Sequence, residues 1–179
     1  IDVVQEQRSN HVVLVDADCH ACIYDGGALA GAETIRFRHN DPESLDKRLA
    51  RLDPKIKGKL VCIEGMYSMY GDTAPVAEFV EVAHKHGAYL LVDEAHSFGV
   101  YGEKGRGVAE AEGVMDKIDF YSGTFSKALA AIGGFVASNH PQAEYLRFSS
   151  RPYKFTASPS PATIASASAA LRNIKETPA

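Results

Sequence analysis

The sequence predicts an α/β protein: a three-layer α/β/α architecture built on a mostly parallel sheet. Short apolar runs, many of them β-branched, recur along the chain and alternate with segments whose apolar residues have helical spacing. Several runs are apolar throughout, as expected for strands that are covered on both faces. The 179 residues are about the length of one domain, and the composition, 45% hydrophobic and 23% charged, is close to the globular average.

The first third of the chain supplies two predicted strands and two predicted helices. Residues 11–15 (HVVLV) form a β-branched run that ends at two nearby aspartates, and residues 20–30 are expected to form a helix after these acidic caps. Residues 33–38 (ETIRFR) alternate apolar and polar side chains, which indicates a strand. Residues 41–52 (DPESLDKRLARL) place Asp at the N-cap, Pro at the first helical position and Leu at helical spacing.

The middle of the chain repeats this alternation. Residues 59–63 (KLVCI) and 88–92 (AYLLV) are apolar runs of strand length. Between them, residues 75–86 (PVAEFVEVAHKH) carry their apolar side chains on one helical face and end at Gly87, which is a natural C-cap.

The last third is expected to contain two more strands, residues 118–122 and 134–137, and two helices, residues 141–148 and 162–174. The Ser/Ala-rich stretch 157–170 is biased in composition. Small residues allow close approach of a helix to its neighbour, so we expect this stretch to be a closely packed helix.

Charge and hydropathy exclude several classes of protein. The formal net charge is −4, which gives no support to a nucleic-acid binder or a polybasic membrane anchor. The longest uncharged stretches, residues 128–143 and 155–171, contain Pro and polar residues, and neither resembles the ~20-residue apolar span of a membrane helix. No signal peptide is recognisable, and the absence of an initial Met suggests that the chain begins inside a longer gene product.

The three cysteines indicate a reducing, cytoplasmic location, because an odd and low count does not suit a disulfide framework. Cys19 and Cys22 form a CxxC, but no second pair of ligands at zinc-finger spacing follows. A zinc or redox role is therefore the minor alternative, and two partly buried thiols that flank His20 are the favoured interpretation. We expect no metal.

Three polar clusters follow predicted strands. Because ligands bind beyond the carboxyl ends of parallel strands, these clusters are expected to meet at one site. They contain Asp16, Asp18 and His20; Asp93, Glu94, Ala95 and His96; and Gly123, Thr124, Phe125, Ser126 and Lys127. The dinucleotide fingerprint GxGxxG, the P-loop GxxxxGK[ST], the nucleophile elbow GxSxG and the zinc motif HExxH are all absent.

The residue types in these clusters suit pyridoxal 5′-phosphate (PLP). That cofactor needs a lysine amine for a Schiff base, a carboxylate for its pyridine nitrogen and donors for its phosphate. Lys127 and Asp93 supply the first two, and the carboxylate would keep the ring nitrogen protonated by its opposite charge. Thr124 can donate to the phosphate, and the His20 ring can stack on the cofactor.

Six segments then resemble the α-oxoamine synthases, fold-type I (aspartate aminotransferase-like) PLP enzymes that condense an amino acid with an acyl-CoA and release CO2. They are DADCHACIYDG (16–26), RFRHND (36–41), IEGMYSMYGDTAP (63–75), LLVDEAHSFGVYGEKGRG (90–107), GTFSKALAAIGG (123–134) and RPYKFTAS (151–158). The resemblance runs from about residue 11 to about residue 174. GTFSK and RPYxFTAS most resemble the branch of the family that uses L-serine and a long-chain acyl-CoA.

The resemblance implies a role for each matching residue. Lys127 would hold the cofactor and act as the base, Asp93 would pair with the pyridine nitrogen, and His96 would bond the phenolic oxygen. His20 would stack on the ring and help to orient the substrate carboxylate.

Further residues would complete the cofactor site. Thr124 and Ser126 would bind the phosphate, and Ser68 would lie near the cofactor. Thr156 would reach the phosphate of the partner subunit, because the family's active sites lie at a homodimer interface. His39 is a further family marker, for which we expect a structural role.

The implied reaction gives a 3-ketosphinganine-type product, CoA and CO2, the first step of sphingolipid synthesis. Three alternatives stay open: a sister synthase that uses glycine or alanine, a non-catalytic partner subunit, and a nucleotide-binding α/β domain. The first two belong to the same family; partner subunits typically lack the Schiff-base lysine, whereas Lys127 is present. The absence of phosphate loops disfavours the third.

Family members are about twice this length. Residues 1–179 are therefore expected to be the core of the large, PLP-binding domain, without the flanking N-terminal segment and the C-terminal small domain. On this expectation, the 179 residues alone would have little or no synthase activity.

Overall fold

A six-stranded sheet forms the centre of the protein in the computed structural model, which describes residues 10–141 and 143–177. The strand order is β2-β1-β3-β4-β5-β6; the first five are parallel, and β6 runs antiparallel to β5. The strands are β1 (His11–Asp16), β2 (Glu33–Phe37), β3 (Gly58–Glu64), β4 (Tyr89–Asp93), β5 (Phe120–Thr124) and β6 (Gly134–Ala137). The predicted α/β class is confirmed, and β5 begins two residues later than expected.

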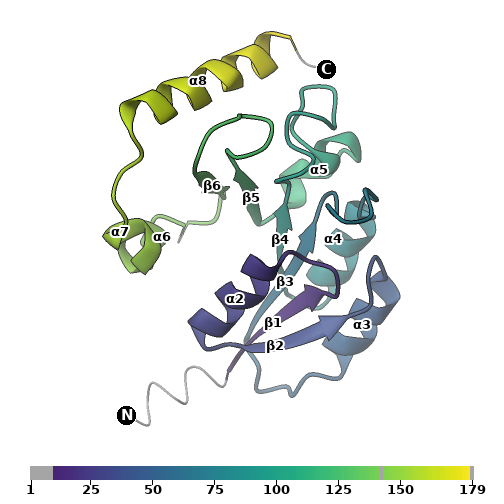
Figure 1. Cartoon of the computed structure of the whole chain (residues 1–179). Coiled ribbons are helices and arrows are strands. Elements are labelled where there is room, and N and C mark those ends of the chain that lie inside the picture. The colour runs from purple at the N-terminus through teal and green to yellow at the C-terminus, as the bar shows by residue number, and fades with distance from the viewer. Residues whose placement is uncertain (1–9, 142, 178–179) are drawn as a thin grey trace.

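Helices connect the parallel strands and lie on both faces of the sheet. Helix α2 lies on one face, and α3 and α4 lie together on the other (Figure 1). This division follows from right-handed crossovers, because the chain first moves outward from β1 to β2 and then returns past β1 to β3. The helices are α2 (Ala21–Ala30), α3 (Pro42–Ala50), α4 (Val76–Lys85), α5 (Val108–Ala111), a 3₁₀ turn η1 (Met115–Lys117), α6 (Tyr145–Ser149), α7 (Arg151–Phe155) and α8 (Pro161–Glu176).

Two helix starts differ in how well the sequence predicts them. Asp41 caps α3 as expected, because its side chain accepts a 2.7 Å hydrogen bond from the Ser44 N–H. The expectation of an acidic cap for α2 is wrong: His20 is the N-cap residue, and its Nδ1 accepts from the Cys22 N–H at 3.2 Å.

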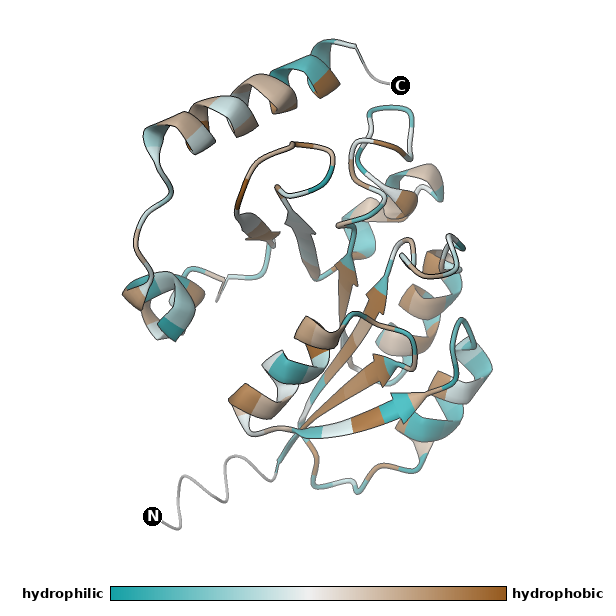
Figure 2. Ribbon diagram, in the orientation of Figure 1, coloured by the Kyte–Doolittle hydropathy of each residue, from teal (hydrophilic) through white to brown (hydrophobic). Residues whose placement is uncertain are grey.

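The core fills the space between the central strands and helices α3 and α4. The middle strands are brown over most of their length in Figure 2, which agrees with burial of both faces. Leu14, Val61 and Leu90 are fully buried. Phe79 of α4 packs against Phe37 of β2, with ring centroids 5.7 Å apart.

The C-terminal part departs most from expectation. Residues 143–144 precede a short helix, α6, instead of belonging to a helix over 141–148, and residue 142 of that range lies outside the described residues. Helix α8 forms as expected but is not closely packed: Ala167 is its one buried residue. Its small side chains bury little area, and its Ile174 lies beside Gly99 and Gly105. Figure 1 shows α8 set apart from the sheet.

Among the described residues, no helix is both long enough and apolar enough to cross a membrane.

Candidate active site

The carboxyl ends of β1, β3, β4 and β5 form one edge of the sheet, and the predicted polar clusters lie there. The chain order reverses between β1 and β3, because β1 leads outward to β2 whereas β3 leads on to β4 and β5. Such a reversal opens a crevice at the strand ends, and open α/β sheets bind ligands in it.

Strand register brings Asp93 to the middle of this edge. Asp93 pairs with Glu64 of β3 on one side and with Ser122 of β5 on the other. Paired positions of neighbouring strands present their side chains to the same face. One oxygen of Asp93 accepts from the Ala95 N–H at 2.9 Å, which leaves the other oxygen for a ligand.

The pKa of His96 depends on three other predicted site residues, Lys127, Asp93 and His20. Burial lowers the pKa of His96, and the Lys127 cation lowers it further, whereas the Asp93 carboxylate opposes both. His20 adds a smaller lowering effect. Asp93 at the end of β4, His96 and Lys127 in the segments that follow β4 and β5, and His20 at the start of α2 are thus close enough to influence the charge of His96. His96 is half-buried and Lys127 is exposed.

Glu64 belongs to the same cluster and was not predicted. Its carboxylate accepts a short hydrogen bond from the His20 N–H, so it fixes the start of α2. Burial raises the pKa of Glu64 to about 7; the His20 N–H opposes this shift and the Asp93 charge adds to it. An acidic residue directly after an apolar strand was the signal that selected Asp93, and the same signal marks Glu64.

Two hydroxyl groups lie at the turn that follows β5. The Thr124 and Ser126 Oγ atoms are 2.9 Å apart, and the Ser126 N–H donates to Thr124 Oγ1 at 3.3 Å. The Phe125 N–H donates to the Gly133 carbonyl at 2.9 Å, which closes the loop that carries Lys127. The loop therefore presents hydroxyl donors and an amine within a few residues.

Two predicted residues are not brought to this cluster by any hydrogen bond described for residues 10–141 and 143–177. Ser68 is exposed in the turn after β3, where the Tyr67 N–H donates to the Asp72 carbonyl at 3.0 Å. Thr156 follows α7 in the exposed C-terminal part. Their proposed roles at the cofactor stay predictions.

The cysteines are free thiols, and the expectation that Cys19 and Cys22 are both partly buried is wrong. Cys19 is buried, with its Sγ 3.6 Å from the Cys62 carbonyl oxygen, whereas Cys22 is exposed on α2. Burial raises the pKa of Cys62 to about 12 and raises that of Cys19 as well. The two buried thiols are therefore unreactive, because the thiolate is the reactive form.

We expect alkylation of the native protein, without added cofactor, to modify Cys22 and to leave Cys19 and Cys62 intact. Burial raises the pKa of the Cys22 thiol too, so its reaction should be slower than that of a free thiol. Iodoacetamide labelling followed by peptide mass mapping measures this. Unfolded protein should be labelled at all three positions, and native labelling of Cys62 at the rate of Cys22 would contradict the prediction.

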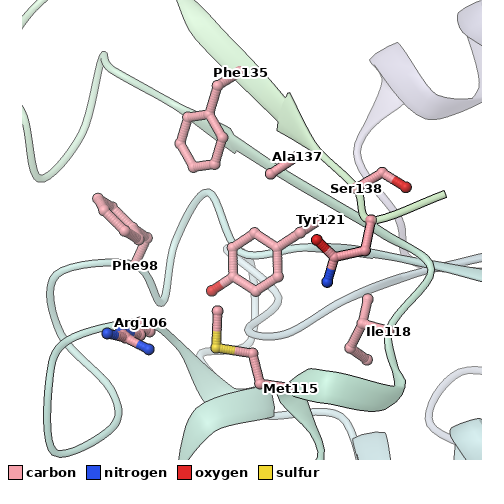
Figure 3. Close-up of a pocket in the computed structure, with 9 residues that line it drawn as sticks. Phe98, Arg106, Met115, Ile118, Tyr121, Phe135, Ala137 and Ser138 are labelled. Atoms are coloured by element: carbon pink, nitrogen blue, oxygen red, sulfur yellow. The ribbon is translucent and has the colours of Figure 1, made fainter. Parts of the chain in front are cut away.

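A separate hollow of about 340 Å³ lies against β5 and β6 (Figure 3). It is lined mainly by apolar and aromatic side chains, among them Phe98, Met115, Tyr121 and Phe135. Arg106 is its one ionised side chain, and none of the clustered acid, histidine and lysine side chains lines it. The polar strand-end cluster is therefore the better candidate for chemistry.

Comparison with known proteins agrees with the motifs. The sequence matches the family described as aminotransferase class I and II over residues 4–179. A serine palmitoyltransferase from Sphingomonas paucimobilis is 57% identical over 162 residues, which cover 90% of this chain and 38% of that protein. An 8-amino-7-oxononanoate synthase from Alkaliphilus metalliredigens is 39% identical over 166 residues, which cover 93% of this chain and 41% of that protein.

A solved structure extends the likeness to the fold. The serine palmitoyltransferase of S. paucimobilis with PLP and myriocin bound superposes with a TM-score of 0.90 and 54% identity, covering 93% of this chain and 42% of that one. The chain thus spans about two fifths of the length of these relatives. The resemblance to the α-oxoamine synthases and the fold-type I architecture are confirmed, and the chain belongs to the aminotransferase class I and II family.

Proposed function

We propose that the protein containing this chain is a PLP-dependent acyltransferase of the serine palmitoyltransferase type. It would condense L-serine with a long-chain acyl-CoA to give a 3-ketosphinganine-type product, CoA and CO2. The observation that carries the proposal is the meeting of Lys127, Asp93, His96 and His20 at one strand-end site, and the 57% identity to a serine palmitoyltransferase supports it.

The donor set fits PLP. A free lysine amine is exposed, a carboxylate with one oxygen left for a ligand stands at the end of β4, and two hydroxyl groups follow β5. PLP, when bound, supplies an aldehyde that bonds to amines and a ring that accepts the electron pair left at the substrate carbon. No other described part of the chain gathers these groups.

The chain's own residues would each hold a part of this chemistry. Lys127 would anchor the cofactor and, once displaced by serine, take the proton from the substrate Cα. The Asp93 carboxylate would keep a proton on the pyridine nitrogen, because the ionised acid stabilises the adjacent positive charge. His96, whose pKa burial and Lys127 lower, would donate to the phenolic oxygen as a neutral ring.

The remaining residues would bind and orient. Thr124 and Ser126 would hold the phosphate through the hydroxyl groups that now contact each other. His20, fixed by Glu64, would lie on the ring face and orient the substrate carboxylate. Ser68 would lie at the cofactor, and Thr156 would reach the phosphate in the partner subunit of a homodimer.

The wider setting belongs to the same proposal. We infer that the chain forms the core of a large PLP-binding domain, since it spans about two fifths of its relatives. Three free cysteines, two of them buried, support a cytoplasmic location.

Borohydride reduction of the full-length protein after incubation with PLP, followed by peptide mass mapping, tests the cofactor assignment. We expect a phosphopyridoxyl adduct on Lys127. An adduct confined to other lysines, or none, would overturn the catalytic proposal and favour a non-catalytic partner subunit.

The assignment of serine as the substrate has a specific alternative, because an 8-amino-7-oxononanoate synthase also matches 93% of this chain. Titration of the PLP-loaded protein with serine, glycine and alanine, read by the cofactor absorbance, separates the two. Saturation by serine at the lowest concentration supports the proposed function. Preference for alanine or glycine would assign the protein to a sister synthase.

A further inference from the structure

His39 lies two residues after β2 between two carboxylates. Its Nδ1 is 2.8 Å from an oxygen of Asp16, and its Nε2 is 2.9 Å from an oxygen of Asp72. The Asp16 side chain at the end of β1 is fully buried, and the His39 side chain is 23% exposed. Three segments therefore meet at this ring: the ends of β1 and β2 and the turn after β3.

Both ring nitrogen atoms face an acceptor, and this geometry specifies the charge of the ring. A neutral imidazole has one N–H, so one of the two carboxylates would face a nitrogen lone pair. A doubly protonated ring donates to both. The arrangement is therefore satisfied by an imidazolium between two ionised acids.

Within residues 10–141 and 143–177, every ion-pair partner of His39 is a carboxylate. Asp18 adds a third carboxylate at 3.5 Å from Nδ1, and Tyr67 and Tyr70 contact the ring with centroids 4.4 and 5.7 Å away. The neighbouring Arg38 is paired with Asp41 at 2.6 Å. Burial alone would lower the pKa of His39, but the bonds to Asp16 and Asp72 outweigh it, and the net shift is upward.

The two acids also bind the backbone and its neighbours, which makes the cluster a fixed unit. Asp16 accepts from the N–H groups of Asp18 and Asn40 at 3.0 and 2.8 Å, and Asp72 accepts from the Asn40 side chain at 2.9 Å. Asp16, Asp18 and His39 bring possible ligand atoms within 4.8 Å of one another. These hydrogen bonds already engage Asp16 and His39, so we assign no metal there.

The cluster connects two loops of the candidate active site. Asp16 and Asp18 begin the loop that leads to His20, and Asp72 closes the turn that carries Ser68. Two links join Asp72 to Asp16: one through the His39 ring and one through Asn40, which donates to Asp16 from its backbone and to Asp72 from its side chain. Breaking the link at His39 would therefore loosen the hold of β1 on the turn.

We propose that His39, as an imidazolium, is a positioning residue that locks the Ser68 turn to the loop carrying His20. The lock itself depends only on the described contacts; its effect on serine binding rests on the proposed function. The lock is present while the ring carries both protons and the two acids are ionised, and it opens as pH rises through the pKa of His39.

The first test is ring nitrogen NMR of the full-length protein, labelled at histidine and free of substrate. We expect both nitrogen atoms of His39 to be protonated below a midpoint that lies above the ordinary histidine value of about 6.5. A midpoint at or below that of the unfolded protein would overturn the proposal.

The second test compares His39→Gln with the control His84→Gln, whose ring is exposed and 3.4 Å from Asp119. A raised folded-state pKa contributes stability below the unfolded pKa, and that stability is lost as pH rises through the folded pKa. The wild type and the control should lose free energy of unfolding across this window. His39→Gln should be less stable below it and should lose less free energy of unfolding across it. Equal pH profiles for all three proteins would contradict the lock.

The third test measures position directly. Hydrogen exchange at the Tyr67 and Gly71 amides, which close the Ser68 turn, should be faster in His39→Gln and unchanged in His84→Gln. The KM for serine should rise with pH at the His39 midpoint in the wild type and be high and pH-independent in His39→Gln. Normal exchange and KM in that variant would overturn the proposal. An altered exchange pattern in a protein with no synthase activity would retain the lock and reject the proposed function.

Discussion

Replacement of Lys127 by alanine should remove the condensation activity of the full-length protein. The amine is the one group proposed both to bond the cofactor and to move the substrate proton, and loss of a positioned base alone costs roughly 10²–10⁴ in rate. We therefore expect kcat/KM to fall by at least ~10³ and borohydride to trap no adduct at this position. Steady-state assays with serine and an acyl-CoA, together with peptide mapping, provide the measurements.

A second variant at Lys127 and a control at another lysine test whether the Lys127 amine acts by bonding to the cofactor or only by its positive charge. Lys127→Arg keeps the positive charge beside Asp93 and His96, but a guanidinium that stays protonated cannot form the bond to the cofactor. It should therefore be as inactive as Lys127→Ala. Lys117→Ala, which removes an exposed lysine from η1, should retain wild-type activity. Substantial activity in Lys127→Arg would show that the residue acts by charge alone.

The sheet and most of the site could be predicted because both follow local rules. Apolar runs and the alternating segment 33–38 predicted strands, and parallel strands bring their polar carboxyl ends to one edge. The same rule would also have selected Glu64, which ends β3 as Asp93 ends β4. The two residues are register partners.

Other features depend on contacts between segments distant in sequence. The two partners of His39, Asp16 and Asp72, are 23 and 33 residues away, so no spacing pattern marks them. Helix α5 is four residues long, too short for a periodic signal, and it is held by the distant Glu94. The exposure of α8 depends on whether other segments of the chain pack against it, and not on its own composition.

Glu94 is the clearest case of a residue whose sequence position suggested the site and whose structure shows a different role. It follows Asp93 directly, just beyond the end of β4. There it is fully buried and accepts from the N–H groups of Val108 and Ala109 at 3.0 and 2.9 Å, and also from the Ser97 hydroxyl. Burial raises its pKa, and these hydrogen bonds oppose the shift.

Glu94→Ala should destabilise the protein strongly. The change leaves two buried N–H groups at the start of α5 without an acceptor, and each costs about 1–3 kcal/mol, so a loss of roughly 2–6 kcal/mol is expected. Total stabilities of domains are about 5–15 kcal/mol, which makes this a large fraction. Urea unfolding measures it. Glu103→Ala, an exposed position in the same loop, should change the stability by no more than about 0.5 kcal/mol.

A double-mutant cycle with Gly65 shows whether the Glu94 carboxylate itself fills this space. A Cβ at Gly65 would lie 2.1 Å from Glu94 Oε2, and Gly65 has no positive φ that would add strain. Gly65→Ala should therefore be strongly destabilising in the wild type and much less so in Glu94→Ala, where the clashing atoms are gone. Residues in contact deviate from additivity by 0.5–3 kcal/mol in such cycles. Additive losses would mean that the carboxylate moves aside freely, in which case it could not be the fixed acceptor that holds α5 against the sheet.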